Sequence, residues 1–285
     1  MEISARSADL LAGLRVASVA LNLPGPVACA RLRDLGATLT KIEPPAGDPF
    51  EQYCPAWYAR LHDGMSVRRL DLKSLEGREA MAALLGECDL LVSAQRPSAL
   101  ARLALDAATL AQRHPRLCHV NVTGHPVPEE EIPGHDLTYM AIHGLVAAGT
   151  MPATLFADMA GAERAVSTAL ALVIARDRDG RGRMAAAPLE DAAAALAAPL
   201  REGLTRAGAL LGGGLAGYNL YQAREGWIAV AALEPHFSRR LAESLQLASL
   251  TTDSLRARFS SESAEHWERW ARERDLPLVA LRIPS

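Results

Sequence analysis

The sequence predicts an α/β protein, with a large Rossmann-like domain built on a parallel sheet and a smaller α+β domain after it. Short strand-like segments alternate with helical segments through the first part of the chain. The 285 residues suffice for one large domain or two ordinary ones. The pattern then changes to two short strands joined by a tight turn. We place the boundary near Met184, which gives domains at residues 1–184 and 185–285.

The first elements form a strand–helix–strand unit. Arg15–Asn22 is rich in Val and Ala and predicts a strand. LPGP then predicts a turn, and VACARLRDL predicts a helix that ends at Gly36, a favourable C-cap residue. Ala37–Glu43 predicts a second strand, which PPAGDP ends. Three such elements in about thirty residues are typical of a parallel βαβ unit.

The same alternation continues to Gly124. A helix opens on Ser74, residues 89–94 predict a strand, residues 98–115 predict a helix, and residues 117–124 predict another strand. Ligands of doubly wound sheets bind beyond the carboxyl ends of the strands. We therefore expect the functional site in the loops that follow Asn22, Glu43, Ala94 and Val122.

The rest of the chain predicts helices and one hairpin. The run AERAVSTALALVIARDRDGRGR predicts a long helix closed by a turn, and residues 184–211 predict an Ala-rich helical stretch. A hairpin follows, with strands YNLYQA and WIAVAAL joined by REG. Two helical segments then complete the smaller domain.

The bulk composition excludes several classes of partner. About half of the residues (49%) are hydrophobic and the net charge is −3, so we expect neither nucleic acid nor an anionic membrane surface as a partner. The start of the chain has no basic segment, and Asp9 and Arg15 interrupt its apolar runs, so we expect no signal peptide, no membrane span and a cytoplasmic location. The four cysteines are isolated, as structural thiols of a reducing compartment are: Cys29, Cys54, Cys88 and Cys118.

The first strand-to-helix turn argues against a nicotinamide cofactor. A dinucleotide fingerprint needs GxGxxG at this position, and NLPGPVA offers one glycine between two prolines. Pro26 has no N–H to donate to a phosphate. The sequence also contains neither a P-loop motif nor the HExxH zinc motif. We expect no metal and no organic cofactor.

Three titratable residues stand at the ends of predicted elements: His135 in PGHDLTY, Asp158 in LFADMAG and Glu234 in ALEP. Each has an ordinary explanation, as a solvated loop histidine, the N-cap of the long helix and a strand-edge carboxylate. A His, an Asp and a Glu at the mouths of elements are also the set that acid–base chemistry uses.

Several runs, in order and over nearly the whole chain, resemble the family III CoA-transferase superfamily and, within it, the α-methylacyl-CoA racemase branch. The block from PGP through DLGA to KIEPP marks the family without marking the reaction. The runs are NLPGPVACARLRDLGATLTKIEPPAGDP, LDLK, DLLVSAQRP, PGHDLTY, LFADMAG and ALEPHF.

The resemblance assigns roles to the three titratable residues. Asp158 matches an aspartate that is a nucleophile in the transferases and an acid/base in the racemases. His135 and Glu234 match racemase residues that transferases generally lack, so the resemblance favours racemisation of a 2-methylacyl-CoA. His135 and Asp158 would exchange the α-proton on opposite faces, and Glu234 would hold the imidazole tautomer. The backbone N–H of Asp136 would donate to the enolate oxygen.

The resemblance also implies an acyl-CoA substrate and a homodimer, and CoA itself belongs to the substrate. Lys41 and Arg96 match family positions near CoA. Arg69 and Lys73 are weaker candidates, because surface charges are commonly only solvated. Gly212–Gly214 would be either a mobile loop near the thioester or simply the turn before the hairpin.

The sequence departs from the family pattern in several places, among them its end and one loop. The chain ends at LPLVALRIPS, so we expect the segment that closes the family's interlocked dimer to be missing. The loop PVPEEE is short and acidic where the family has a TGWGQ-like stretch. Two alternatives to racemisation therefore stay open: CoA transfer through an acyl-Asp158 anhydride, and a truncated, non-catalytic CoA-binding homologue.

Overall fold

The computed structural model describes residues 9–282. They fall into two compact units, which lie within Met1–Ala197 and Ala198–Ser285. The boundary comes later than the predicted residue 184, because β6 (Met184–Ala186) pairs with β5 (Cys118–Asn121) in the large unit's sheet. The stretch expected to be wholly helical is therefore a strand followed by helix α10 (Leu189–Leu196) and the short α11 (Ala198–Arg201).

The large unit confirms the predicted Rossmann-like fold. Its six strands are all parallel and lie in the order β3-β2-β1-β4-β5-β6, so the order reverses between β1 and β4. The sequence did not predict β3, because its residues SVRR are all exposed at the sheet edge and show no apolar alternation. The remaining bounds are β1 Arg15–Ser18, β2 Thr38–Glu43, β3 Ser66–Arg69 and β4 Leu90–Ser93.

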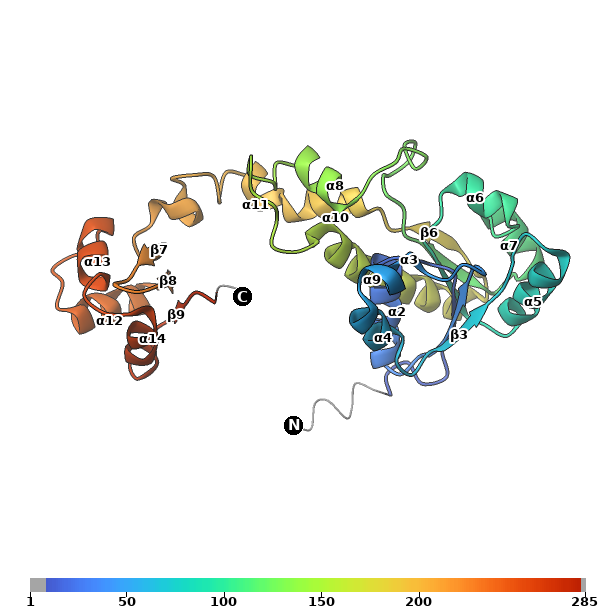
Figure 1. The fold of residues 1–285 in the computed structure, drawn as a ribbon, viewed down its shortest axis with the longest axis horizontal. Helices are drawn as coiled ribbons and strands as arrows, with labels where there is room; N and C mark the ends of the chain where they lie inside the picture. The colour runs from blue at the N-terminus through green and yellow to red at the C-terminus, as the bar shows by residue number, and fades with distance from the viewer. Residues whose placement is uncertain (1–8, 283–285) are drawn as a thin grey trace. The chain divides into compact units, whose positions relative to one another are not determined.

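Helices cover both faces of this sheet (Figure 1). One face packs against α2 (Pro24–Asp34) and the long α9 (Phe156–Asp179). The other packs against α5 (Leu75–Gly86), α6 (Pro97–Arg102) and α7 (Ala107–Arg113). Successive strand residues point to opposite faces, which is why neighbours in one strand belong to different clusters: Val16 and Leu90 to the first, Ala17 and Leu91 to the second.

Several helix boundaries differ from the prediction. LPGP is the start of α2 and not a turn, since a helix's first turn needs no N–H from proline. The single helix predicted for residues 98–115 is two helices, because Ala104 has a φ of 55° and Asp106 caps α7 through the Thr109 N–H, at 3.0 Å. Three short helices were not predicted: α3 (Pro49–Tyr53), α4 (Pro55–His62) and α8 (Asp136–Ile142).

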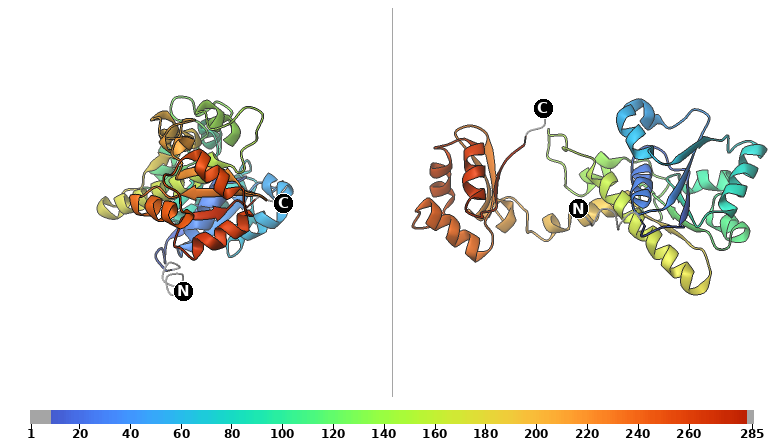
Figure 2. Two further views of the ribbon diagram at one scale, coloured as in Figure 1. Left: turned by 90° about the vertical axis from the view of Figure 1, so that its left-hand side faces the viewer. Right: turned by 90° about the horizontal axis from the view of Figure 1, so that it is seen from below.

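The small unit contains the predicted hairpin, β7 (Tyr218–Gln222) and β8 (Trp227–Ala231), and an unpredicted third antiparallel strand, β9 (Leu278–Ala280). Three helices, and not two, pack on this sheet, on one side of the strands (orange and red, Figure 2). They are α12 (Pro235–Leu245), α13 (Thr252–Phe259) and α14 (Ala264–Arg272). The run Gly212–Gly214 lies in the segment Leu210–Gly214 just before β7, and the backbone there is kinked, with non-helical conformations at Gly212 and Gly213. No helix within residues 9–282 has the length and apolar character needed to cross a bilayer.

Candidate active site

A cavity of about 460 Å³ opens at the carboxyl ends of the large unit's strands. Its walls come from the segments that follow β1, β4 and β5, together with the residues around Gly134 and the start of α9. This is where a doubly wound sheet binds ligands, beside the point at which the strand order reverses. The volume is in the usual range for a small-molecule site.

His135, Asp158 and Arg96 all line this cavity. His135 is the N-cap residue of α8, and its backbone N–H donates to Thr138 Oγ1 at 3.0 Å, which fixes the backbone from which the imidazole extends. Asp158 lies in the first turn of α9 and is partly buried. Two groups that can move protons thus reach one cavity from two different helices.

Asp136 has a role in this site that the sequence did not reveal. Its buried carboxylate accepts a hydrogen bond from the backbone N–H of Asp158, with 2.9 Å between Oδ1 and N. The first N–H groups of a helix have no partner within that helix, so Asp136 supplies one for α9. Asp158 itself does not cap α9, because the N-cap residue is Leu155. A cap donated by a separate helix leaves no local sequence signal.

The surroundings change the acidity of Asp158. Burial, followed by the nearby charge of Asp136, raises the pKa of its carboxyl to about 7. Near neutral pH the carboxyl therefore exists in both protonation states, and it can either accept or donate a proton.

Tyr139 forms part of the cavity wall, and its side chain leaves no room for a Cβ atom at two neighbouring glycine positions. A Cβ atom added to Gly124 or Gly134 would overlap the Tyr139 side chain. The glycine that precedes His135 is therefore required by close packing. Burial, followed by the charges of Asp158 and Glu190, raises the pKa of Tyr139 to about 12, so the phenol stays protonated at neutral pH.

The charge of Lys41 is compensated within the protein, and its predicted contact with CoA stays a prediction. The side chain is buried, and its Nζ lies 2.6 Å from Asp48 Oδ2 and 3.1 Å from Glu43 Oε1. Two carboxylates already compensate the ammonium, so it holds the loop after β2 against the sheet. His62 Nε2 completes the cluster at 2.8 Å from Nζ.

The other predicted cations are exposed. Arg96 lies at the N-cap of α6 and lines the large cavity. Lys73 lines a neighbouring cavity of about 190 Å³, whose walls are mainly apolar and which shares Leu21 with the large one. Arg69, on the edge strand β3, pairs with Glu51 at 3.5 Å.

Glu234 belongs to the small unit, where it is the exposed N-cap residue of α12 and makes no cap hydrogen bond through its side chain. Its carboxylate is therefore available to a partner. The predicted support of His135 by Glu234 stays a prediction.

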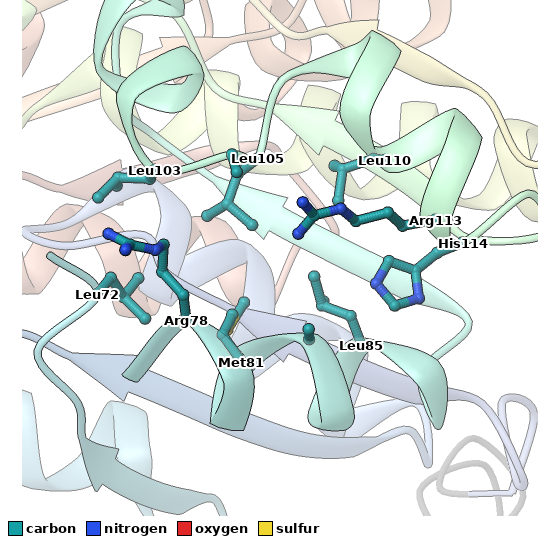
Figure 3. A pocket seen from close by; sticks show the side chains of 11 residues that line it. Leu72, Arg78, Met81, Leu85, Leu103, Leu105, Leu110, Arg113 and His114 are labelled. Atoms are coloured by element: carbon teal, nitrogen blue, oxygen red, sulfur yellow. The ribbon is translucent and has the colours of Figure 1, made fainter. Parts of the chain in front are cut away.

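A further hollow lies between α5, α7 and the α6–α7 connection (Figure 3). Its walls are mostly leucines and Met81, with the side chains of Arg78, Arg113 and His114 around it. Its volume of about 20 Å³ has room for little more than a water molecule. It contains none of the predicted site residues, so it is not a candidate for catalysis.

Comparison with known proteins places these residues in a family context. The model of CoA-transferase family III matches residues 11–279. The chain is 30% identical to cinnamoyl-CoA:phenyllactate CoA-transferase of Clostridium sporogenes over 162 residues, which cover 50% of this chain and 39% of that protein. It is 28% identical to alpha-methylacyl-CoA racemase of Mus musculus over 258 residues, which cover 84% of this chain and 66% of the mouse protein.

Solved structures confirm the fold. A hypothetical protein from Mycobacterium tuberculosis matches with a TM-score of 0.82 and 23% identity, over 95% of this chain and 84% of that chain. A CAIB/BAIF family protein from Brucella suis matches with a TM-score of 0.80 and 21% identity, over 96% and 84%. The sequence relatives include both CoA-transferases and a racemase, so the comparisons give the class of enzyme and leave the reaction open.

Proposed function

The chain belongs to CoA-transferase family III, and from this premise we propose that it removes and returns the α-proton of a 2-methylacyl-CoA or a similar acyl-CoA thioester. One observation carries the proposal. His135 and Asp158 line the same cavity from different helices, and Asp158 has a pKa of about 7. Inversion at the α-carbon requires two such groups, one on each face.

The proton transfer proceeds through an enolate. One group of the pair takes the α-proton as a base, and the electrons of the C–H bond move to the thioester oxygen. The other group then protonates the α-carbon on the opposite face, and the electrons return to the carbonyl. After each turnover the protonation states of His135 and Asp158 are reversed. Proton exchange with solvent then restores the starting states.

The enolate oxygen needs a hydrogen-bond donor. Asp136 is the first residue of α8, where backbone N–H groups have no acceptor within the helix. We assign its N–H to the enolate oxygen, while its carboxylate holds Asp158. To Glu234 we assign the role of accepting a hydrogen bond from the His135 imidazole, which would fix the tautomer of the ring.

The CoA part of the substrate extends from the large cavity into its neighbour. Arg96 provides positive charge at the first, and Lys73 provides it at the second, whose apolar walls suit the flat adenine ring. The shared wall at Leu21 makes the two cavities adjacent. Arg69 is the last residue of the edge strand β3, so it adds positive charge at the carboxyl end of that strand. We assign it no direct contact with CoA.

CoA transfer is the second candidate function. Asp158 would attack the thioester carbonyl, forming an acyl–carboxylate anhydride as the C–S bond breaks and CoA leaves as the thiolate. Two observations favour it. Several relatives are CoA-transferases. Among the described residues of the large unit, the histidines that pair with a carboxylate are His125 and His143, so His135 has no carboxylate of its own unit at ion-pair distance.

Two assays separate these reactions. Incubation of one 2-methylacyl-CoA enantiomer in D2O will give racemisation with deuterium at the α-carbon for the wild type, and no racemisation for His135→Ala. Borohydride trapping with acyl-CoA alone will leave Asp158 unmodified. A reduced Asp158 side chain together with no racemisation would establish transfer instead.

A further inference from the structure

Three potential metal ligands gather behind the wall of the large cavity: His125, Glu129 and Glu190. Their ligand atoms all lie within 4.8 Å of one another. We propose that these residues bind one zinc ion, which fastens the segment between β5 and α8 to the start of α10. The proposal does not depend on which reaction the enzyme catalyses.

The backbone of each residue is fixed by the fold. His125 follows β5 closely and is buried. Glu190 is the second residue of α10, and its N–H donates to the Gly124 carbonyl at 3.0 Å, so the two ligand-bearing segments are joined next to the site. Glu129 closes a turn through a hydrogen bond from its N–H to the Pro126 carbonyl, at 2.8 Å. Little rearrangement is therefore needed to assemble the ligands.

The charges of the cluster are not balanced by cationic side chains. Glu190 Oε2 lies 2.6 Å from His125 Nδ1, and the Glu190 side chain is only 18% exposed. Among the described residues, no lysine or arginine lies within ion-pair distance of Glu129 or Glu190. Neighbouring carboxylates repel each other unless a proton or a cation intervenes, and of this pair Glu190 is partly buried while Glu129 is exposed. Elsewhere in this fold the ammonium group of Lys41 compensates two neighbouring carboxylates. A metal ion would compensate the carboxylates of Glu129 and Glu190 in the same way.

His143 adds a second, independent observation. Its Nε2 lies 3.6 Å from Glu190 Oε1, is shielded from solvent, and has no hydrogen-bond partner among the described residues. A buried imidazole nitrogen without a partner costs free energy. It lies beside Glu190, outside the group of three residues whose ligand atoms lie within 4.8 Å of one another.

The ligand chemistry favours zinc. Imidazole nitrogen with carboxylate oxygen is a zinc donor set, held tetrahedrally at about 2.0–2.2 Å. Magnesium and calcium prefer ligand shells made of oxygen alone. Binding would place the Nδ1 lone pair of His125 on the metal, so the ring proton would move to Nε2 and the present Nδ1–Glu190 hydrogen bond would be replaced.

The ion would affect the cavity indirectly, through residues that form its wall. The His125 ring packs edge-on against Tyr139, with 5.1 Å between ring centroids, and Tyr139 lines the cavity. The segment that the ion fastens also carries Glu130, Gly134 and His135 into the cavity wall. The metal would therefore position the segment and would not contact the substrate.

Direct metal binding tests this inference. Purified full-length protein is freed of metal with a chelator and titrated with Zn²⁺ by calorimetry, and with Co²⁺ by visible absorption. We expect one equivalent of Zn²⁺, tetrahedral Co²⁺ bands that Zn²⁺ removes and Mg²⁺ does not, and a higher melting temperature with Zn²⁺. Glu190→Gln and Glu129→Gln should each weaken binding by more than about 10-fold, as even outer-shell changes do at zinc sites.

Glu129 is exposed, so its replacement separates lost metal binding from misfolding. Glu79→Gln, a change at an exposed carboxylate on α5, is the matched control and should bind Zn²⁺ like the wild type. Absence of stoichiometric binding in the wild type would overturn the proposal. Wild-type affinity in both Glu129→Gln and Glu190→Gln would also overturn it, by showing that any zinc is bound elsewhere.

Discussion

Asp158 takes its chemical character from its surroundings and not from its sequence neighbours. Burial raises its pKa to about 7, and Asp136 contributes both a like charge and the hydrogen bond that fixes the Asp158 backbone. The residue type and the loop could be predicted from the sequence, since Asp158 lies in a run of apolar and small residues. The pKa could not, because it depends on a carboxylate that comes from another helix.

A stability measurement tests the raised pKa. The folded pKa lies above the unfolded value of 3.8, so ionisation of Asp158 opposes folding, and this penalty is absent below about pH 4 and complete above about pH 7. Asp158→Asn should raise the free energy of unfolding by about 2 kcal/mol at pH 8, after allowance for partial solvent screening. Urea unfolding should show no gain at pH 3.5. An equal gain at both pH values would contradict the assignment.

The charge of Asp136 can be separated from its hydrogen bond. Asp136→Asn retains an oxygen that accepts from the Asp158 N–H but removes the repulsion, so the pKa of Asp158 should fall. The limb of the pH–rate profile that reports Asp158 should move to lower pH. Asp136→Ala should in addition lose about 1–3 kcal/mol of stability, because it leaves the N–H without a partner. An unshifted limb in Asp136→Asn would show that burial alone sets the pKa.

At the level of elements, apolar patterns predicted the strands and helices that have a buried face. Two of the missed strands, β3 and β6, lack such a face, and the third, β9, has only three residues, of which Leu278 and Ala280 are buried. All residues of β3 are exposed, and β6 is a three-residue strand within an Ala-rich run. The break between α6 and α7 depends on one backbone conformation, at Ala104, which residue type does not specify. The segments that follow β1, β4 and β5 were nevertheless predicted to form the site, because the fold class fixes where strands end.

Lys41, which holds the loop after β2, is expected to act as a structural cation, whereas Arg96 is expected to bind the substrate. Lys41→Met would leave the buried carboxylates of Glu43 and Asp48 without their ammonium. We expect a loss of about 3–5 kcal/mol in the free energy of unfolding, measured by urea denaturation. Arg96→Met is the matched control, because Arg96 is exposed in the cavity wall, and it should raise KM for acyl-CoA by about 10-fold with unchanged stability. A Lys41→Met protein of normal stability with a raised KM would instead identify Lys41 as a CoA ligand.

At the scale of the whole molecule, the candidate machinery is divided between two units. The large unit carries His135, Asp158 and the cavity, and the small unit carries Glu234. The aligned region spans 39% of the Clostridium sporogenes transferase and 66% of the mouse racemase. The proposed pairing of Glu234 with His135 therefore joins residues of different units and needs an experimental test.

Glu234→Gln tests that relation. If Glu234 orients the His135 imidazole, the variant should lower kcat for racemisation by about 10- to 100-fold and leave KM within about 2-fold, because the substrate contacts are retained. Glu225→Gln, at another exposed carboxylate of the small unit, should leave both constants unchanged. A wild-type kcat in Glu234→Gln would remove Glu234 from the mechanism.

The most direct test of the central claim uses each enantiomer of a 2-methylacyl-CoA separately, in D2O, with His135→Ala and Asp158→Asn. With one base on each face, the wild type should exchange the α-proton of both enantiomers. Each variant should lose racemisation but still exchange the enantiomer whose proton faces the base that remains, and the two variants should prefer opposite enantiomers. No exchange by the folded wild type, or loss of the same enantiomer in both variants, would contradict the account.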